Sequence, residues 1–243
     1  MFRVFRLIGY ICAPNQFRGR YSLLAMWLNK PILDMFAEIP ADTTIPNEYY
    51  GVYNWVLRGA FGHVYTVHPF YELPECYKDP SLLPEGKTAY DFSVTYAITL
   101  QNNPLLFLEI KPPGHLNDLS ARFAADKQMR ERFHSLRPIT TTPRLHGISV
   151  MGQRLAFYHM DKSSGCIFPK LPTSGDVPID WWKMDITTKA GNREFNTVAR
   201  DVKNMTEETA TALRRRHDPD YDDGLFVTLR KFLWLLYSNS GRL

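Results

Sequence analysis

The chain has 243 residues, of which 44% are hydrophobic and 22% charged, and its formal net charge is +4. These proportions are those of an ordinary globular protein with enough apolar material for a sizeable core, and the mild positive charge permits an anionic partner without requiring one. Cys12, Cys76 and Cys166 lie far apart and form no CxxC pair, which argues against a disulfide framework or a zinc site. Reduced thiols favour a cytoplasmic or nuclear compartment.

The N-terminal stretch MFRVFRLIGYICA has the basic residues and apolar run of a signal peptide, but the length of the run and the cleavage site do not suit one. The apolar run over 7–13 is at the lower limit of length, and YICAP is a weak cleavage site. No apolar stretch is long enough to span a bilayer. We therefore expect an intracellular protein without a membrane partner, with secretion disfavoured.

Hydrophobic periodicity and turn residues predict a chain of alternating helices and strands. The predicted elements, in chain order, are a helical segment over 21–40, a helix over 46–62, a strand over 63–71, a proline-punctuated loop over 72–88, two strands within 90–114, a helix over 117–136, a hairpin over 144–161, a helix near 192–216 and a helix near 224–237.

Two of the helices have clear end signals. Pro46 suits the first turn of the helix over 46–62, and Gly62 suits its end. The helix over 117–136 can be capped by Asn117 or Asp118, and Pro138 follows its last turn.

The stretch YDFSVTYAITLQNNPLLFLEIKPPG over 90–114 reads as two strands joined by a turn at Asn102-Asn103-Pro104. Asp91 opens the first strand, and Glu109-Ile110-Lys111 closes the second. The run LLFL before Glu109 is apolar on both faces, which indicates a central strand of a sheet.

These polar residues predict a metal site for phosphate chemistry. A buried carboxylate is costly unless it is compensated, and a divalent cation between Asp91 and Glu109 would relieve both desolvation and repulsion. Because side chains of a strand alternate, Lys111 lies on the same face as Glu109, and Ile110 offers its carbonyl as a further ligand. The metal would activate water and the lysine would orient it or neutralise charge, as phosphodiester hydrolysis requires.

The pattern of Asp91, a hairpin, Glu109-x-Lys111 and a long helix resembles the PD-(D/E)XK nuclease superfamily, with Tyr90 in place of the usual proline. The resemblance covers about 46–160 and implies a restriction-endonuclease-like α/β fold that uses Mg²⁺ or Mn²⁺. It also implies that Gln128 is the helix glutamine of the exonuclease-like branches, and that Glu48, or second Glu38, is their first-helix glutamate. FLEIKPPG and ADKQMRERF are further similar to nuclease-like domains of fungal multicopy proteins and Crinkler-type effectors.

Each candidate also has a structural interpretation. Asp91 could start a strand or turn, Glu48 could interact with a helix dipole, and Gln128 is an ordinary helix residue. The basic residues of the helix over 117–136 could contact phosphates or pair within the helix. Those assigned to nucleic-acid binding are Arg122, Lys127 and Arg130.

We therefore expect a single domain over 1–243, with N-terminal helices over 1–45, a nuclease-like core over 46–160 and a C-terminal helical extension over 161–243. The expected function is a metal-dependent nuclease acting on DNA, or on RNA. The alternative is a non-catalytic nuclease-fold module that binds nucleic acid or a protein partner. A third interpretation is a structural salt bridge between Lys111 and the two acids.

Overall fold

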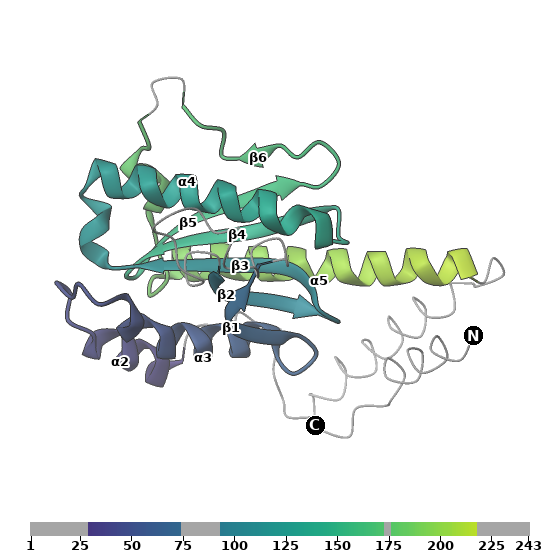
Figure 1. Ribbon diagram of the computed structural model, residues 1–243. Coiled ribbons are helices and arrows are strands. Elements are labelled where there is room, and N and C mark those ends of the chain that lie inside the picture. The colour runs from purple at the N-terminus through teal and green to yellow at the C-terminus, as the bar shows by residue number, and fades with distance from the viewer. Residues whose placement is uncertain (1–28, 74–92, 173–175, 218–243) are drawn as a thin grey trace, which may run out of the picture.

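The computed structural model describes residues 29–73, 93–172 and 176–217 of the chain. These residues form a mixed α/β structure in which one open sheet lies between helices (Figure 1). The predicted α/β class is therefore confirmed. Asp91 and the helix predicted near 224–237 lie outside the described residues, as does most of the loop over 72–88.

The helices agree closely with the sequence patterns. Asn29 caps the first described helix, and Asp118 caps the long helix predicted over 117–136 by accepting hydrogen bonds from two backbone N–H groups. Pro46 opens the short element η1 (Pro46–Tyr49), which leads directly into α3 (Tyr50–Phe61), and Gly62, at a left-handed φ of 64°, follows α3. The helical elements are α2 (Lys30–Glu38), η1 (Pro46–Tyr49), α3 (Tyr50–Phe61), η5 (Pro113–Leu116), α4 (Leu119–Leu136), η6 (Arg137–Ile139), η7 (Ile179–Trp182) and α5 (Lys189–His217).

The strands form a seven-stranded sheet in the order β1-β2-β3-β4-β5-β6, and β7 also pairs with β5. All pairs are antiparallel except β3 and β4, which run parallel because α4 crosses between them. The strands are β1 (Thr66–Glu72), β2 (Ser93–Leu100), β3 (Asn103–Lys111), β4 (Arg144–Met151), β5 (Arg154–Asp161), β6 (Ile167–Phe168) and β7 (Met184–Asp185).

Two features differ from the sequence prediction. The turn between β2 and β3 lies at Gln101 and Asn102, which have left-handed φ values of 53° and 66°, so Asn103 and Pro104 already belong to β3. The reason is that the proline ring holds φ near −65° and cannot adopt the positive φ that a tight hairpin turn requires. The extension after 161 is also not purely helical, since β6 and β7 join the sheet before α5 begins.

The sheet separates two apolar cores, one on each face. Helices α2, α3 and α5 cover one face, and α4 with the segment around Trp182 covers the other (Figure 1). Along β3, Leu108 and Ile110 enter the first core, and Phe107 enters the second. None of the helices in the described part of the chain is both long and apolar enough to cross a membrane.

Gly147 of β4 lies where α4 packs tightly on the sheet. A β-carbon there would lie 2.7 Å from Met129 and 2.8 Å from Phe133, both on α4. We expect Gly147→Ala to lower the free energy of unfolding by about 1–3 kcal/mol, because the added methyl group overpacks this contact. Chemical denaturation measures the change. Gly114→Ala is the control, because a β-carbon there meets no atom within 4 Å, and an equal effect of both substitutions would contradict the packing argument.

Candidate active site

Glu109 and Lys111 end strand β3 on the face that α4 covers. Strand alternation places Glu109 on the same side as Phe107, whose ring packs on Phe133 of α4 with centroids 4.8 Å apart. Ile110 points to the opposite core. The expectation that Glu109 and Lys111 share a face, with Ile110 on the other, is therefore confirmed.

The Glu109 carboxylate lies in a buried polar cluster between β2, β3 and α4. Arg132 of α4 donates from Nε to Glu109 Oε1 at 3.1 Å, and the side chains of both residues are only 5–6% exposed. Thr95 of β2 directs its hydroxyl toward Glu109 Oε2 at a longer distance of 3.4 Å. The same hydroxyl oxygen accepts a hydrogen bond from the Ile110 N–H at 3.2 Å. Three successive main elements of the chain, β2, β3 and α4, thus converge on one carboxylate.

Burial raises the pKa of Glu109 above its ordinary value. The positive charges of Arg132 and Lys111, and the hydrogen bonds from Arg132 and Thr95, act in the opposite direction and lower that pKa. Desolvation is the largest effect because the carboxylate has almost no contact with solvent. Glu109 is consequently a carboxylate whose charge depends on its two cationic neighbours.

Tyr50, at the start of α3, extends the cluster toward the edge of the sheet. Burial raises the pKa of its hydroxyl, the Glu109 charge raises it further, and a hydrogen bond with Thr95 lowers it. Its backbone carbonyl accepts a hydrogen bond from the Tyr96 hydroxyl at 2.8 Å. These contacts hold the aromatic ring of Tyr50 beside the Glu109 cluster.

A buried serine lies level with Glu109 on the next strand. The parallel register of β3 and β4 pairs Glu109 with Ser149, which is fully buried. The Ser149 hydroxyl has no hydrogen-bond partner among the described residues. An unpartnered buried hydroxyl is uncommon in folded proteins. Glu109 and Ser149 therefore form a polar pair of neighbours in the sheet, and the hydrogen-bonding capacity of Ser149 is not used by any described residue.

The other sequence-predicted site residues are placed as follows. Gln128 is half-buried on α4, one turn before Arg132 and on the same side of the helix. Glu48 is exposed in η1, where burial raises the pKa of Tyr49 and the Glu48 charge raises it further, and Glu38 is exposed at the end of α2. No interaction found in the described part of the chain brings Glu48 or Glu38 to Glu109.

The three basic residues assigned to nucleic acid differ in their surroundings. Arg122 donates to the carbonyls of Val177 and Leu116, at 3.0 and 2.8 Å. Arg130 pairs with Asp126 at 2.8 Å and donates to the Pro169 carbonyl. These two guanidinium groups hold neighbouring segments on α4. Lys127 is largely exposed, 4.0 Å from Glu131, and its assignment stays a prediction.

The described residues around Glu109 do not by themselves fit a divalent cation. They provide one carboxylate, which is already paired with Arg132 and lies next to Lys111, so the local charge is positive. No group of three acidic, histidine or cysteine side chains suited to a metal is found within 29–73, 93–172 and 176–217. A cation here would need a second acid and the release of Glu109 from Arg132.

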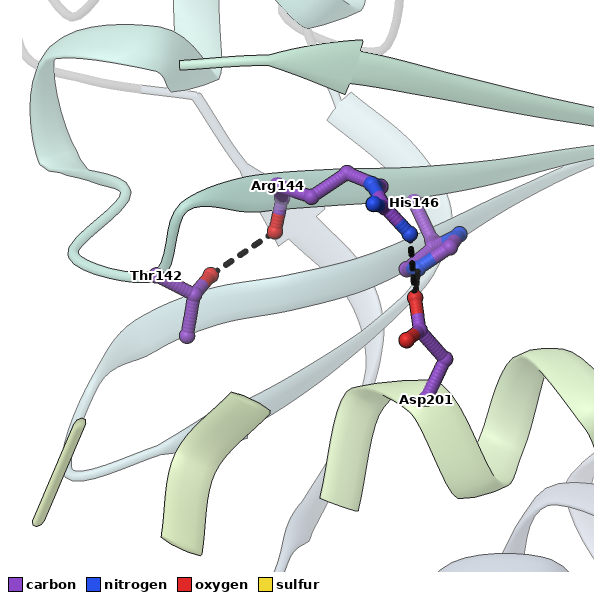
Figure 2. Close-up of polar contacts among 4 residues, drawn as sticks. All are labelled: Thr142, Arg144, His146 and Asp201. Carbon is purple, nitrogen blue, oxygen red and sulfur yellow. Dashed lines mark hydrogen bonds and ion pairs between the residues drawn. The ribbon is translucent and has the colours of Figure 1, made fainter. Parts of the chain in front are cut away.

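A second polar cluster lies on the opposite face of the sheet, between β4 and α5 (Figure 2). Asp201 of α5 accepts hydrogen bonds from Arg144 and from the ring of His146, both at 2.7 Å. Thr142 donates to the Arg144 carbonyl at 2.8 Å. This cluster joins α5 to the start of β4 and is separated by the sheet from Glu109.

Sequence reasoning missed the partners of Glu109. Arg132 follows Gln128 by four residues, so helical spacing could have identified it once Gln128 was a candidate. Thr95 and Ser149 carry no such signal, because the sheet register that places them depends on a bulge in β2 and on the crossover through α4. Tyr50 is likewise positioned only by the packing of α3 on the sheet.

The first prediction for this site concerns the buried ion pair. We expect Arg132→Met to lower the free energy of unfolding by about 3–5 kcal/mol, because it leaves the Glu109 carboxylate buried without its partner. Adding Glu109→Gln should restore a large part of that loss, because no buried charge then remains. Chemical denaturation of the single and double variants measures both effects.

The control is Lys30→Met, which breaks the exposed Lys30–Asp34 pair at 2.7 Å. Exposed pairs contribute about 0–1 kcal/mol, so this variant should remain close to the wild type in stability. Equal effects of Lys30→Met and Arg132→Met would show that the buried pair is not a structural constraint.

The second prediction concerns pH. Burial is the main effect on the pKa of His146 and lowers it, the hydrogen bond and charge of Asp201 raise it, and Arg144 and His159 lower it further. Because the folded-state pKa is below that of the unfolded chain, protonation favours the unfolded state as the pH falls below the ordinary histidine range. We expect wild-type stability to decrease between pH 7.5 and 5.5, and His146→Gln to show a smaller decrease in denaturant titrations. An identical pH dependence in both proteins would contradict this.

Comparison with known proteins gives no match to this chain. No protein-family model, no curated protein and no solved structure matches it. The geometry of the Glu109 cluster is therefore the basis on which a function can be argued.

Proposed function

We propose that this chain is a nuclease of the PD-(D/E)XK type that hydrolyses phosphodiester bonds of DNA, or of RNA. The observation that carries the proposal is the pair Glu109 and Lys111, side by side at the end of a central strand, with Arg132 of the following helix bonded to the carboxylate. A buried carboxylate with a perturbed pKa beside specific charged partners is a candidate for a functional site.

The order of the elements supports a restriction-endonuclease-like arrangement. Helix α3 precedes the antiparallel strands β1, β2 and β3, and α4 then leads to β4, which pairs parallel with β3. This is the order that the resemblance to the superfamily implies. Glu109 and Lys111 occupy the end of the third strand, as they would in that fold.

The charges of the described cluster suit a phosphate group. Arg132 and Lys111 provide two positive charges against one carboxylate, so the cluster would attract an anion. A guanidinium group and an ammonium group are the side chains that bind phosphate oxygens most strongly. Within the proposal, Lys111 neutralises charge that develops on the phosphate, and Arg132 holds Glu109 until a phosphate competes for the guanidinium.

The proposal assigns a Mg²⁺ or Mn²⁺ ion to Asp91, Glu109 and the carbonyl of Ile110. When bound, such an ion lowers the pKa of a water molecule and stabilises a developing oxyanion. Asp91 would be the second acid that the described cluster requires, and it lies two positions before β2 in the sequence. Gln128, one turn from Arg132, would steady the same group of side chains.

A second candidate function is a non-catalytic nuclease-fold module that binds nucleic acid or a protein. The close Glu109–Arg132 pair favours this candidate, because a neutralised carboxylate is a poor metal ligand. The position of Lys111 beside that pair favours the nuclease, because its ammonium group can neutralise charge that develops on a phosphate. The two candidates differ in whether divalent metal promotes cleavage.

The test is cleavage of labelled duplex, plasmid and single-stranded substrates by the purified full chain with Mg²⁺ or Mn²⁺. We expect Lys111→Ala to reduce the rate about 100-fold or more, the effect of removing one group that stabilises transition-state charge. Lys30→Ala is the control, because Lys30 is an exposed lysine of α2 whose ion pair is with Asp34 of the same helix. Circular dichroism should show both variants folded.

Two results would contradict the nuclease proposal. One is a wild-type protein that cleaves none of these substrates with either metal. The other is cleavage that Lys111→Ala leaves unchanged. Binding of nucleic acid without any cleavage would support the non-catalytic module instead.

A further inference from the structure

Phe70 is an exposed aromatic residue in an unusual backbone conformation. It lies on β1, the edge strand of the sheet, with a left-handed φ of 50°, and it is 48% exposed. Positive φ is rare for bulky residues other than glycine and costs conformational energy. Such a conformation persists where the surrounding structure enforces it, often at a binding site.

The Phe70 ring is connected to the Glu109 cluster through Tyr50. The two rings pack edge to face, with centroids 5.5 Å apart and an interplanar angle of 70°. Tyr50 in turn packs edge to face on Tyr96, at 6.3 Å. The Tyr50 hydroxyl interacts with Thr95, whose own hydroxyl points toward Glu109. A continuous set of contacts therefore runs from the exposed ring to the buried carboxylate.

The sheet register places Phe70 close to the same level. Phe70 lies between the β1 residues that pair with Tyr96 and Val94, so it stands level with Thr95 on β2. Thr95 is level with Glu109 on β3, as their side-chain contact shows. Two strand spacings, about 10 Å, separate the backbones of Phe70 and Glu109. The aromatic rings and the positively charged cluster thus lie at one level of the sheet, with Tyr50 packed on the first core and Glu109 on the face that α4 covers.

We propose that Phe70, supported by Tyr50, stacks a nucleobase of an unpaired strand whose phosphate lies at Lys111 and Arg132. The inference rests on the proposed function and specifies its substrate class. Stacking on an aromatic side chain requires a base that is not stacked within a duplex, and it tolerates any base because each has a π-face. The substrate is therefore single-stranded nucleic acid or an unpaired end, in preference to the interior of a duplex.

The experiment measures binding by fluorescence anisotropy of labelled oligonucleotides of about twelve nucleotides, within the usual site size of single-strand binders. Single-stranded and duplex probes are compared in EDTA, so that binding is observed without cleavage. We expect tighter binding of the single strand. Phe70→Ala and Phe70→Leu should weaken it about tenfold, and Phe70→Tyr should retain it, because a tyrosine ring can still stack on the base.

The matched control is Phe123→Ala. Phe123 is 46% exposed, close to the 48% of Phe70, but it lies on α4 beside Leu119 and Asp176, which line a surface hollow with it. This variant should bind as the wild type does. Thermal denaturation identifies any variant that is not folded, and Phe70→Leu keeps the side chain apolar if Phe70→Ala is unstable.

The inference is overturned if Phe70→Leu binds the single strand as tightly as the wild type, or if the duplex binds equally well. The outcome is separable from that of the proposed nuclease. A wild type that binds through Phe70 but cleaves nothing would support the stacking site and contradict the nuclease. A wild type that cleaves nucleic acid, together with a Phe70→Leu variant that binds the single strand as tightly as the wild type, would support the nuclease and contradict the stacking site.

Discussion

The buried ion pair between Glu109 and Arg132 is the interaction on which the rest of the site depends. It joins the end of β3 to the helix that crosses from β3 to β4, and it gives a carboxylate a cationic partner where water is almost absent. Neither group could stay at this position alone, since an isolated buried charge is strongly destabilising. Any ligand of this cluster, whether phosphate or cation, must therefore compete with an existing partner.

That competition gives the site a definite chemical character. Lys111 adds a second positive charge beside the pair, so the described cluster favours anions over cations. Toward the sheet edge, Tyr50 and Phe70 add an aromatic surface of increasing exposure. A phosphate with an attached base would complement both features, because the phosphate is an anion and the base has a face that stacks on aromatic rings. The opposite face of the sheet has a different role, because the Asp201 cluster there attaches α5 to β4.

Local sequence signals were sufficient for most of the fold. Helical spacing and an N-cap at Asp118 predicted α4 to within two residues, and apolar runs joined by turn residues predicted both hairpins. The hairpin turn was misplaced because Asn103-Pro104 resembles a turn, whereas the tight connection requires positive φ, which Gln101 and Asn102 adopt. The short strands β6 and β7 carry too few residues for any periodicity to reveal them.

The sequence by itself determined that Glu109 and Lys111 lie together, because side chains along a strand alternate with a period of two. Only the tertiary structure decided what they face. A bulge between Ile98 and Thr99 shifts the register of β2 by one residue, so a threonine rather than a valine stands opposite Glu109. The path of α4 across the sheet likewise determines that Arg132 reaches the carboxylate. Register and helix placement result from packing over the whole core, which no local stretch of residues encodes.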